Sequence, residues 1–447
     1  MNPTVKNVAR FVARQTVGRL PARASRLTGR LALDGGTPVR DTRIRPWARD
    51  RSSNLLQWFT SVGPAFRSIF LGGMEGLPQT RQRHFAELWA EYCGCRHALL
   101  LPHGTDALRL AIAAVFDHDG LEYGGEVIVP NLSFIASATA PLDRRFGVAF
   151  VDVDPGTLNL DPKCVEEAII PGRTRAILPV HQFGQPADMT ALHAIARKHD
   201  LKIIEDAAQA HGAVWESGPV GSLGDAAGFS FQSAKNLSCG EGGILTTNDT
   251  EVFERAHSLH NAGRTPKEGS RWEHPSLGWN CRPTEYQAAL LIHRFSIFER
   301  QQEVRARNFR RLRELMADVA CLRPLDIHRG VRRHGMYMFV MRYHSENCGG
   351  LPLEEFLRAA GAEGAPLNRC YEFTMSAQPS MQRILAWRPE YIRVNSTPAA
   401  DKAVNEIIYI SANVFLGNEA DMDDIAASIK KVERHFSTLG IQKRERN

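Results

Sequence analysis

The chain has 447 residues, of which 43% are hydrophobic and 23% charged, a composition typical of globular proteins. Its formal charge is +6, but seven basic residues and no acid fall within residues 1–33, which leaves −1 for the remainder. A near-neutral body argues against a nucleic-acid partner, and no apolar run approaches the roughly 20 residues that span a bilayer. We therefore expect a large domain with a smaller one, no nucleic-acid binding and no stable membrane insertion.

The basic N-terminal stretch, residues 1–30, lacks the continuous apolar run of a secretory signal. We favour a mobile, solvated extension, and a transit peptide or a membrane-surface helix are the alternatives. The eight cysteines form no CxxC pair and no Cys/His set with metal-ligand spacing. They predict reduced thiols, a cytoplasmic location and no metal site.

From residue 98 onward, short apolar runs alternate with helical patterns. Strands separated by helices predict an α/β fold with a mainly parallel sheet, which binds ligands at the carboxyl ends of its strands. The predicted strands are 97–102, 126–130, 150–153, 176–180 and 201–205, and the predicted helices between them are 107–115 and 189–198.

Residues 292–317 are rich in Arg, Glu and Gln without Pro or Gly, which predicts one long polar helix at a domain junction. A strand at 337–343 and amphipathic helices at 353–360 and 421–436 follow. We therefore predict a large domain over residues 31–295 and a smaller C-terminal α+β domain over 296–440.

Gly104-Thr105-Asp106 stands between a predicted buried strand and a helix. Glycine lets the backbone approach a ligand, and the free N–H groups of a helix start favour an anion such as phosphate. Taken alone, this pattern favours the simpler interpretation that Thr105 or Asp106 caps the helix.

The segment Ile203–Gly212 ends a strand of apolar residues in two carboxylates. Asp206 is placed to point into the crevice at the strand end, where a buried carboxylate needs a cationic partner such as a protonated pyridine nitrogen. A surface acid at a strand terminus is the alternative interpretation.

Lys235 lies in a block of apolar, small and glycine residues, Gly228–Gly243. Because desolvation lowers the pKa of a lysine, this surrounding makes Lys235 a candidate Schiff-base residue. Ser230, in the same block, could donate a hydrogen bond to a phosphate.

In combination, these motifs resemble the pyridoxal-phosphate (PLP)-dependent sugar aminotransferases of the DegT, DnrJ, EryC and StrS type, over residues 31 to 436. The resemblance implies the fold type I, or aspartate-aminotransferase-like, architecture, with a mainly parallel seven-stranded sheet in the large domain. The segments that carry it are Pro130–Phe134, Val151–Asp154, Pro179–Gly184, Glu205–Gln209, the Lys235 block and Gly278–Glu285.

The family's roles transfer to matching positions. Lys235 is implied to form the Schiff base and to move the proton, and Asp206 to pair with the pyridinium nitrogen. The implied cofactor contacts are Gln209 at the ring 3-oxygen, Phe134 over the ring, and Gly104, Thr105 and Ser230 at the phosphate. Asn280 is implied to reach a second subunit's phosphate, which predicts a homodimer with shared active sites.

Within the family, Leu31–Arg40 and the block from Phe231 to Gly243 resemble the branch that aminates keto-cyclitols with glutamine, and its relative that makes aminohydroxybenzoate. We expect ping-pong transfer of an amino group from glutamine or glutamate to a keto-cyclitol or keto-sugar. Ala234, Pro283 and the absence of a histidine from Tyr409–Val414 depart from the family pattern and put the substrate in doubt. The alternatives are a nucleotide-linked keto-sugar aminotransferase, a PLP-dependent deoxysugar dehydratase and a non-catalytic PLP-binding paralogue.

Overall fold

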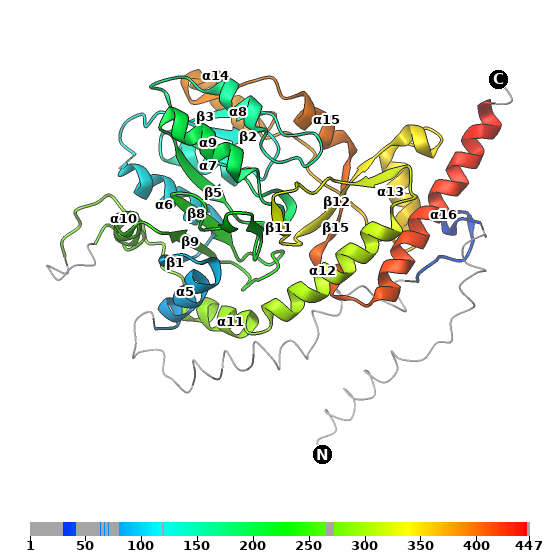
Figure 1. Cartoon of the computed structure of the whole chain (residues 1–447), viewed down its shortest axis with the longest axis horizontal. Helices are drawn as coiled ribbons and strands as arrows, with labels where there is room; N and C mark the ends of the chain where they lie inside the picture. Colours follow the sequence, from blue (N-terminus) through cyan, green and yellow to red (C-terminus); the bar gives the residue numbers. More distant parts are fainter. Residues whose placement is uncertain are drawn as a thin grey trace, which may run out of the picture.

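A computed structural model describes residues 30–41, 80–118, 120–264 and 272–444, together with Gly63, Arg67 and Phe70. The predicted N-terminal extension therefore lies, apart from Arg30, outside the described residues. Figure 1 shows a larger α/β domain beside a smaller one, with α12 running along both.

An eight-stranded sheet forms the centre of the larger domain, in the order β1-β9-β8-β5-β4-β2-β3-β14. Among these strands β9 alone runs against its neighbours, so the sheet is mainly parallel, as predicted. The strands are β1 His97–Leu101, β2 Glu126–Pro130, β3 Gly147–Val151, β4 Thr174–Ile177, β5 Lys202–Asp206, β8 Ala226–Ser230, β9 Gly243–Thr247 and β14 Ile392–Val394.

The expected count of seven strands is wrong by one, because β14 joins the sheet from the C-terminal part of the chain. Its residues Ile392–Val394 pair in parallel with Val148–Phe150 of β3. Residues 31–40, which were expected in the large domain, instead contact the smaller one. Arg40 forms buried ion pairs there with Asp421 and Asp424. The division into domains at residue 295 stays a prediction. Each of these two segments, β14 and residues 31–40, contacts the domain on the other side of that division in the sequence.

Helices cover both faces of the large sheet because neighbouring strand residues point to opposite sides. Leu100 and Ile128 face one apolar core, whereas Leu99 and Val127 face the other. The first core is covered by α5 Thr80–Cys93, α8 Pro162–Ala168, α9 Met189–His199 and α11 Glu285–Phe295, and the second by α6 Gly104–Phe116, α7 Ala136–Asp143, α10 Thr250–His260 and α14 Pro379–Trp387.

The smaller domain packs four helices on a four-stranded antiparallel sheet in the order β10-β12-β15-β13. Its elements are α12 Phe298–Leu315, α13 Leu353–Ala362, α15 Pro398–Glu406, α16 Glu419–Arg444, β10 Leu322–Pro324, β12 Met338–Tyr343, β13 Asn368–Arg369 and β15 Ile407–Ser411. A small third sheet is formed by β6 Val214–Trp215, β7 Gly218–Pro219 and β11 Val331–Arg333.

The single helix expected over residues 292–317 is wrong, because α11 ends at Phe295 and α12 begins at Phe298. The Ser296 hydroxyl donates a 2.8 Å hydrogen bond to the His293 carbonyl, a contact that bends helices. Ile297, with φ −111° and ψ −1°, is the N-cap from which α12 starts anew.

Candidate active site

A cavity of about 510 Å³ lies at the carboxyl ends of β1, β5 and β8, where a parallel sheet places ligands. Seven of the eight residues predicted for the site line it: Gly104, Thr105, Phe134, Asp206, Gln209, Ser230 and Lys235. Asn280 does not line this cavity. It lies exposed beside the end of α10, in a β-bridge with Asn261.

Lys235 is the cavity's amine. Burial lowers its pKa to about 8, and the nearby carboxylate of Asp206 opposes that shift. The Lys235 Nζ lies 3.4 Å from the Tyr337 hydroxyl and 4.5 Å from the centroid of its ring. A lysine with this pKa is partly neutral near pH 8, so it can act as a nucleophile and as a proton carrier.

Asp206 ends β5 with its side chain facing the cavity and only 4% of the residue exposed. One carboxylate oxygen accepts a 2.7 Å bond from the Ser137 hydroxyl, and the other accepts from the Ala208 N–H at 3.2 Å. Burial raises the pKa of Asp206, and these two hydrogen bonds and Lys235 oppose the rise. The site thus holds a desolvated carboxylate that a cation in the cavity would stabilise.

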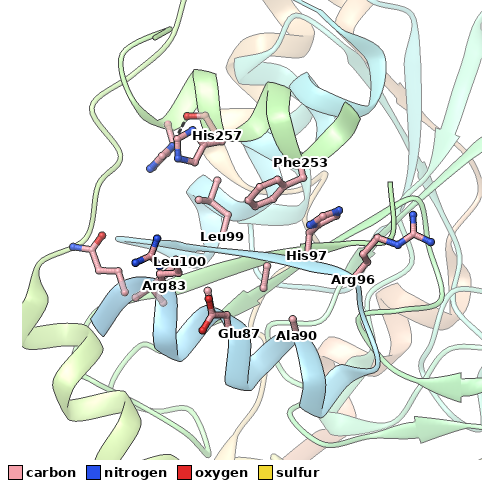
Figure 2. A pocket seen from close by; sticks show the side chains of 13 residues that line it. Arg83, Glu87, Ala90, Arg96, His97, Leu99, Leu100, Phe253 and His257 are labelled. Atoms are coloured by element: carbon pink, nitrogen blue, oxygen red, sulfur yellow. Dashed lines mark hydrogen bonds between the residues drawn. The ribbon is translucent and has the colours of Figure 1, made fainter. Parts of the chain in front are cut away.

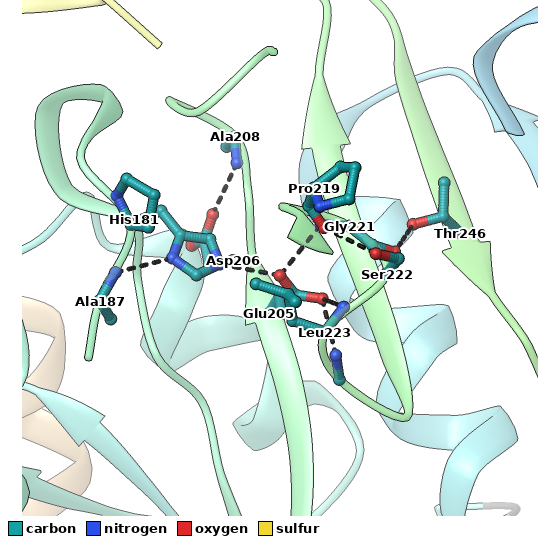
Figure 3. Close-up of polar contacts among 12 residues, drawn as sticks. His181, Ala187, Glu205, Asp206, Ala208, Pro219, Gly221, Ser222, Leu223 and Thr246 are labelled. Atoms are coloured by element: carbon teal, nitrogen blue, oxygen red, sulfur yellow. Dashed lines mark hydrogen bonds and ion pairs between the residues drawn. The ribbon is translucent and has the colours of Figure 1, made fainter. Parts of the chain in front are cut away.

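A buried Glu205–His181 pair fixes the strand from which Asp206 projects (Figure 3). Both carboxylate oxygens of Glu205 are occupied, by backbone N–H groups of residues 221, 223 and 224 and by His181. The His181 backbone N–H, in turn, donates to the Asp206 carbonyl. The two adjacent acids therefore differ in role, because Glu205 is fully bonded inside the fold whereas Asp206 faces the cavity.

Gln209 is held by contacts on both ends of its amide. Its side-chain oxygen accepts from the Phe183 N–H at 2.8 Å, and its nitrogen donates to the Tyr371 hydroxyl at 3.0 Å. One N–H of the amide therefore stays available toward the cavity.

The opposite end of the cavity is the start of α6. The helix begins at Gly104, and its N-cap, His103, makes no side-chain capping bond. The interpretation of Thr105 or Asp106 as the cap is therefore wrong: Thr105 lies within the first turn and lines the cavity, and Asp106 bonds Arg109 instead. A Cβ at Gly104 would lie 2.7 Å from the Cβ of Ser230, so only glycine fits where this helix start meets β8.

This cavity suits the cofactor that the resemblance implies. The start of α6, uncapped by any side chain, with the Thr105 and Ser230 hydroxyls nearby, forms an anion cradle. Asp206 would be the partner of a pyridinium nitrogen, and Lys235 would be the amine that bonds the cofactor. The residues present therefore fit PLP: the start of α6 would hold its phosphate, and Asp206 and Lys235 would hold its ring.

Tyr337 is a cavity residue that the sequence patterns did not identify as one. The sequence predicts it only as the start of the strand at 337–343. Its place beside Lys235 arises from the approach of the smaller domain. The cavity also includes Ser133, Gln232 and Glu241 at its walls.

A second cavity, of about 400 Å³, lies between α5, β1 and α10 (Figure 2). Ala90, Leu99 and Phe253 supply apolar walls, and Arg83 and Arg96 supply charge. It contains no lysine and shares no residue with the Lys235 cavity.

Within the described part of the chain, no helix has the length and apolar character needed to cross a membrane. A search of the same residues finds no group of three or more His, Cys, Asp or Glu side chains arranged to hold a metal ion.

Comparison with known proteins shows what the chain as a whole is similar to. Residues 76–430 match the DegT/DnrJ/EryC1/StrS aminotransferase family. L-glutamine:2-deoxy-scyllo-inosose aminotransferase of Streptoalloteichus tenebrarius is 34% identical, over 92% of this chain and 99% of that protein. L-glutamine:scyllo-inosose aminotransferase of Streptomyces griseus is 33% identical, over 90% and 97%. The crystal structure of 3-amino-5-hydroxybenzoic acid synthase superposes with a TM-score of 0.73 at 29% identity, covering 84% of this chain and 96% of that one.

Proposed function

Because the chain belongs to the DegT/DnrJ/EryC1/StrS aminotransferase family and is a PLP-dependent transaminase, we propose that it moves an amino group from glutamine to the ketone of a cyclitol ring. The observation that carries the proposal is the single cavity in which Lys235, Asp206 and an anion cradle converge. The relatives that cover nearly all of the chain support the choice of donor and acceptor, since their names specify glutamine and a scyllo-inosose.

In this proposal Lys235 would hold the cofactor through its amine, and that amine, when free, would carry the proton to and from the reacting carbon. Bound PLP supplies an electron sink for the charge that develops there. Asp206 would keep the ring nitrogen protonated, Gln209 would donate to the ring 3-oxygen, and the start of α6 with Ser230 would hold the phosphate. Donor and acceptor would occupy the same cavity in turn, the donor leaving its amino group behind before the acceptor enters, so we expect ping-pong kinetics.

The acceptor is tested by steady-state assays with glutamine as donor. We expect kcat/KM for scyllo-inosose and 2-deoxy-scyllo-inosose to exceed that for nucleotide-linked keto-hexoses by at least about tenfold, or about 1.4 kcal/mol in transition-state binding. The reverse order would refute the cyclitol acceptor and leave the transaminase assignment standing. Glutamate is assayed in parallel, and equal use of both donors would contradict a glutamine site.

We further propose a homodimer whose active sites are shared. Asn280 is exposed and does not line its own chain's cavity, and Phe134 at the cavity wall is 61% exposed, so both suit burial against a second copy. A Lys235→Ala chain mixed with an Asn280→Ala chain should regain activity, because one site in each hybrid then has both residues. Hybrids that form without regaining activity would refute the shared site.

We also propose a cytoplasmic location. All eight cysteines are free thiols, and Cys93, Cys281, Cys321 and Cys348 are buried. Free thiols are typical of proteins from reducing compartments. Fractionation of cells that express the tagged chain tests this, and recovery from the medium or the membranes would contradict it.

A further inference from the structure

The ring of Trp279 lies against two guanidinium groups. The Arg109 group, from α6, is 4.5 Å from the ring centroid, and the Arg144 group, from the end of α7, is 4.4 Å from it. Contacts at this range are attractive cation–π interactions. Arg109 also donates to Asp106 at 2.6 Å and to the Cys281 sulfur at 3.4 Å.

The backbone on both sides of Asn280 is fastened to the end of α10. The Trp279 N–H donates to the Leu259 carbonyl at 2.7 Å, and the Cys281 N–H donates to the His260 carbonyl at 2.9 Å. Asn280 itself bridges to Asn261. The backbone of this short extended segment is therefore held on both sides of Asn280.

Alternation along the extended segment directs the Asn280 side chain outward. Cys281 is buried at 4% exposure and Trp279 is held by the arginines, so both neighbours face inward. Asn280, between them, is exposed. The contacts of Trp279 with Arg109 and Arg144 thus add a side-chain anchor next to Asn280 and hold the segment from which its exposed side chain projects.

We propose that Arg109 is a positioning residue that, by holding Trp279, presents Asn280 to the active site of a second copy of this chain. The inference rests on the shared-site dimer proposed above. Arg109 has a competing role open to it within its own chain, because its partner Asp106 lines the Lys235 cavity. The two roles differ in which subunit's cofactor site suffers when Arg109 is replaced.

Hybrid dimers separate the two roles. Chains carrying different affinity tags are co-expressed, and the hybrids are purified on both tags in sequence. The reference hybrid pairs a wild-type chain with a Lys235→Ala chain, so it has one site that can bond PLP. In the trans hybrid the Lys235→Ala chain also carries Arg109→Leu. In the cis hybrid Arg109→Leu is instead on the chain that keeps Lys235.

PLP is titrated into each hybrid, and the visible absorbance of lysine-bound cofactor reports the single working site. In the trans hybrid we expect half-saturation at a PLP concentration about tenfold above the reference, because one of the two cation–π contacts that hold the segment carrying Asn280 is lost. In the cis hybrid we expect a value within about twofold of the reference. Arg109→Lys in the trans hybrid should restore part of the affinity, since a cation again lies over the ring.

The matched control is Arg197→Leu, an exposed arginine on α9 far from this segment, which should leave PLP binding unchanged. A second variant, Trp279→Leu, should reproduce the trans pattern and guards against a folding defect peculiar to Arg109→Leu. The proposal would be overturned if Arg109→Leu weakened PLP binding in the cis hybrid only, or weakened it equally in the cis and trans hybrids. Failure of the Asn280→Ala complementation would instead overturn the shared site, and the role of Arg109 with it.

Discussion

Replacing Asp206 by Asn tests the charge of the site without changing its shape. Asparagine keeps the oxygen that accepts from Ala208, and its amide can donate to the Ser137 hydroxyl where the carboxylate accepted. The Ser137 proton can then turn to Ser133, whose hydroxyl lies 3.0 Å away. Every buried polar group therefore keeps a partner, and we expect the free energy of unfolding to change by less than about 1 kcal/mol.

The catalytic effect should be much larger. Without the negative charge the cofactor's ring nitrogen loses its counter-ion, so we expect kcat to fall about 10²-fold or more, which corresponds to about 2.7 kcal/mol or more. Steady-state rates with glutamine give kcat, and the cofactor's absorbance shows whether PLP is retained. Ser137→Ala is the control, because it removes a hydrogen bond but keeps the carboxylate, and it should cost less than about tenfold. A kcat within about threefold of wild type in Asp206→Asn would refute the reasoning.

Three further predictions concern the amine and the phosphate end. Lys235→Ala should abolish turnover and lysine-bound cofactor absorbance in a folded protein, and a borohydride-reducible PLP adduct in the variant would contradict the assignment. Capture of PLP by the apoenzyme should speed up as pH rises through about 8, since the reactive neutral amine has a pKa lowered to about 8; a rate that is flat between pH 6.5 and 9 would exclude this. Gly104→Ala should weaken PLP binding on the order of tenfold, because overpacking against Ser230 costs about 1–3 kcal/mol. Gly361→Ala, whose added Cβ meets no atom within 4 Å, is the control for the same titration.

The grouping of Asp206 and Lys235 in one cavity could be predicted from the sequence, because both lie at or shortly after the ends of predicted strands. Asp206 and Lys235 follow apolar strands, and the carboxyl ends of parallel strands meet at one edge, so the sequence order alone brings them together. The role of Thr105 was harder to judge, because a cap and a phosphate contact use the same residue type at nearly the same position. The structure separates the two only through the position of Gly104 as the first helical residue.

Contacts between distant segments were beyond the reach of sequence patterns. Tyr337 reaches Lys235 because the smaller domain approaches the sheet, and no local periodicity encodes that approach. β14 has three residues, which is too few to show an alternating pattern. The bend at Ser296 depends on one side-chain hydrogen bond within an otherwise uninterrupted polar sequence.

The position of β14 has a consequence for synthesis on the ribosome. The edge of β3 has no partner beyond β2 until Ile392–Val394 have been made, about 240 residues after β3, which is roughly 10–50 s at ribosomal rates of about 5–20 residues per second. During that interval the nascent large domain exposes a strand edge of the kind that pairs with other chains. Chaperone demand and aggregation should therefore depend on translation speed between β3 and β14, even though neither segment touches the Lys235 cavity.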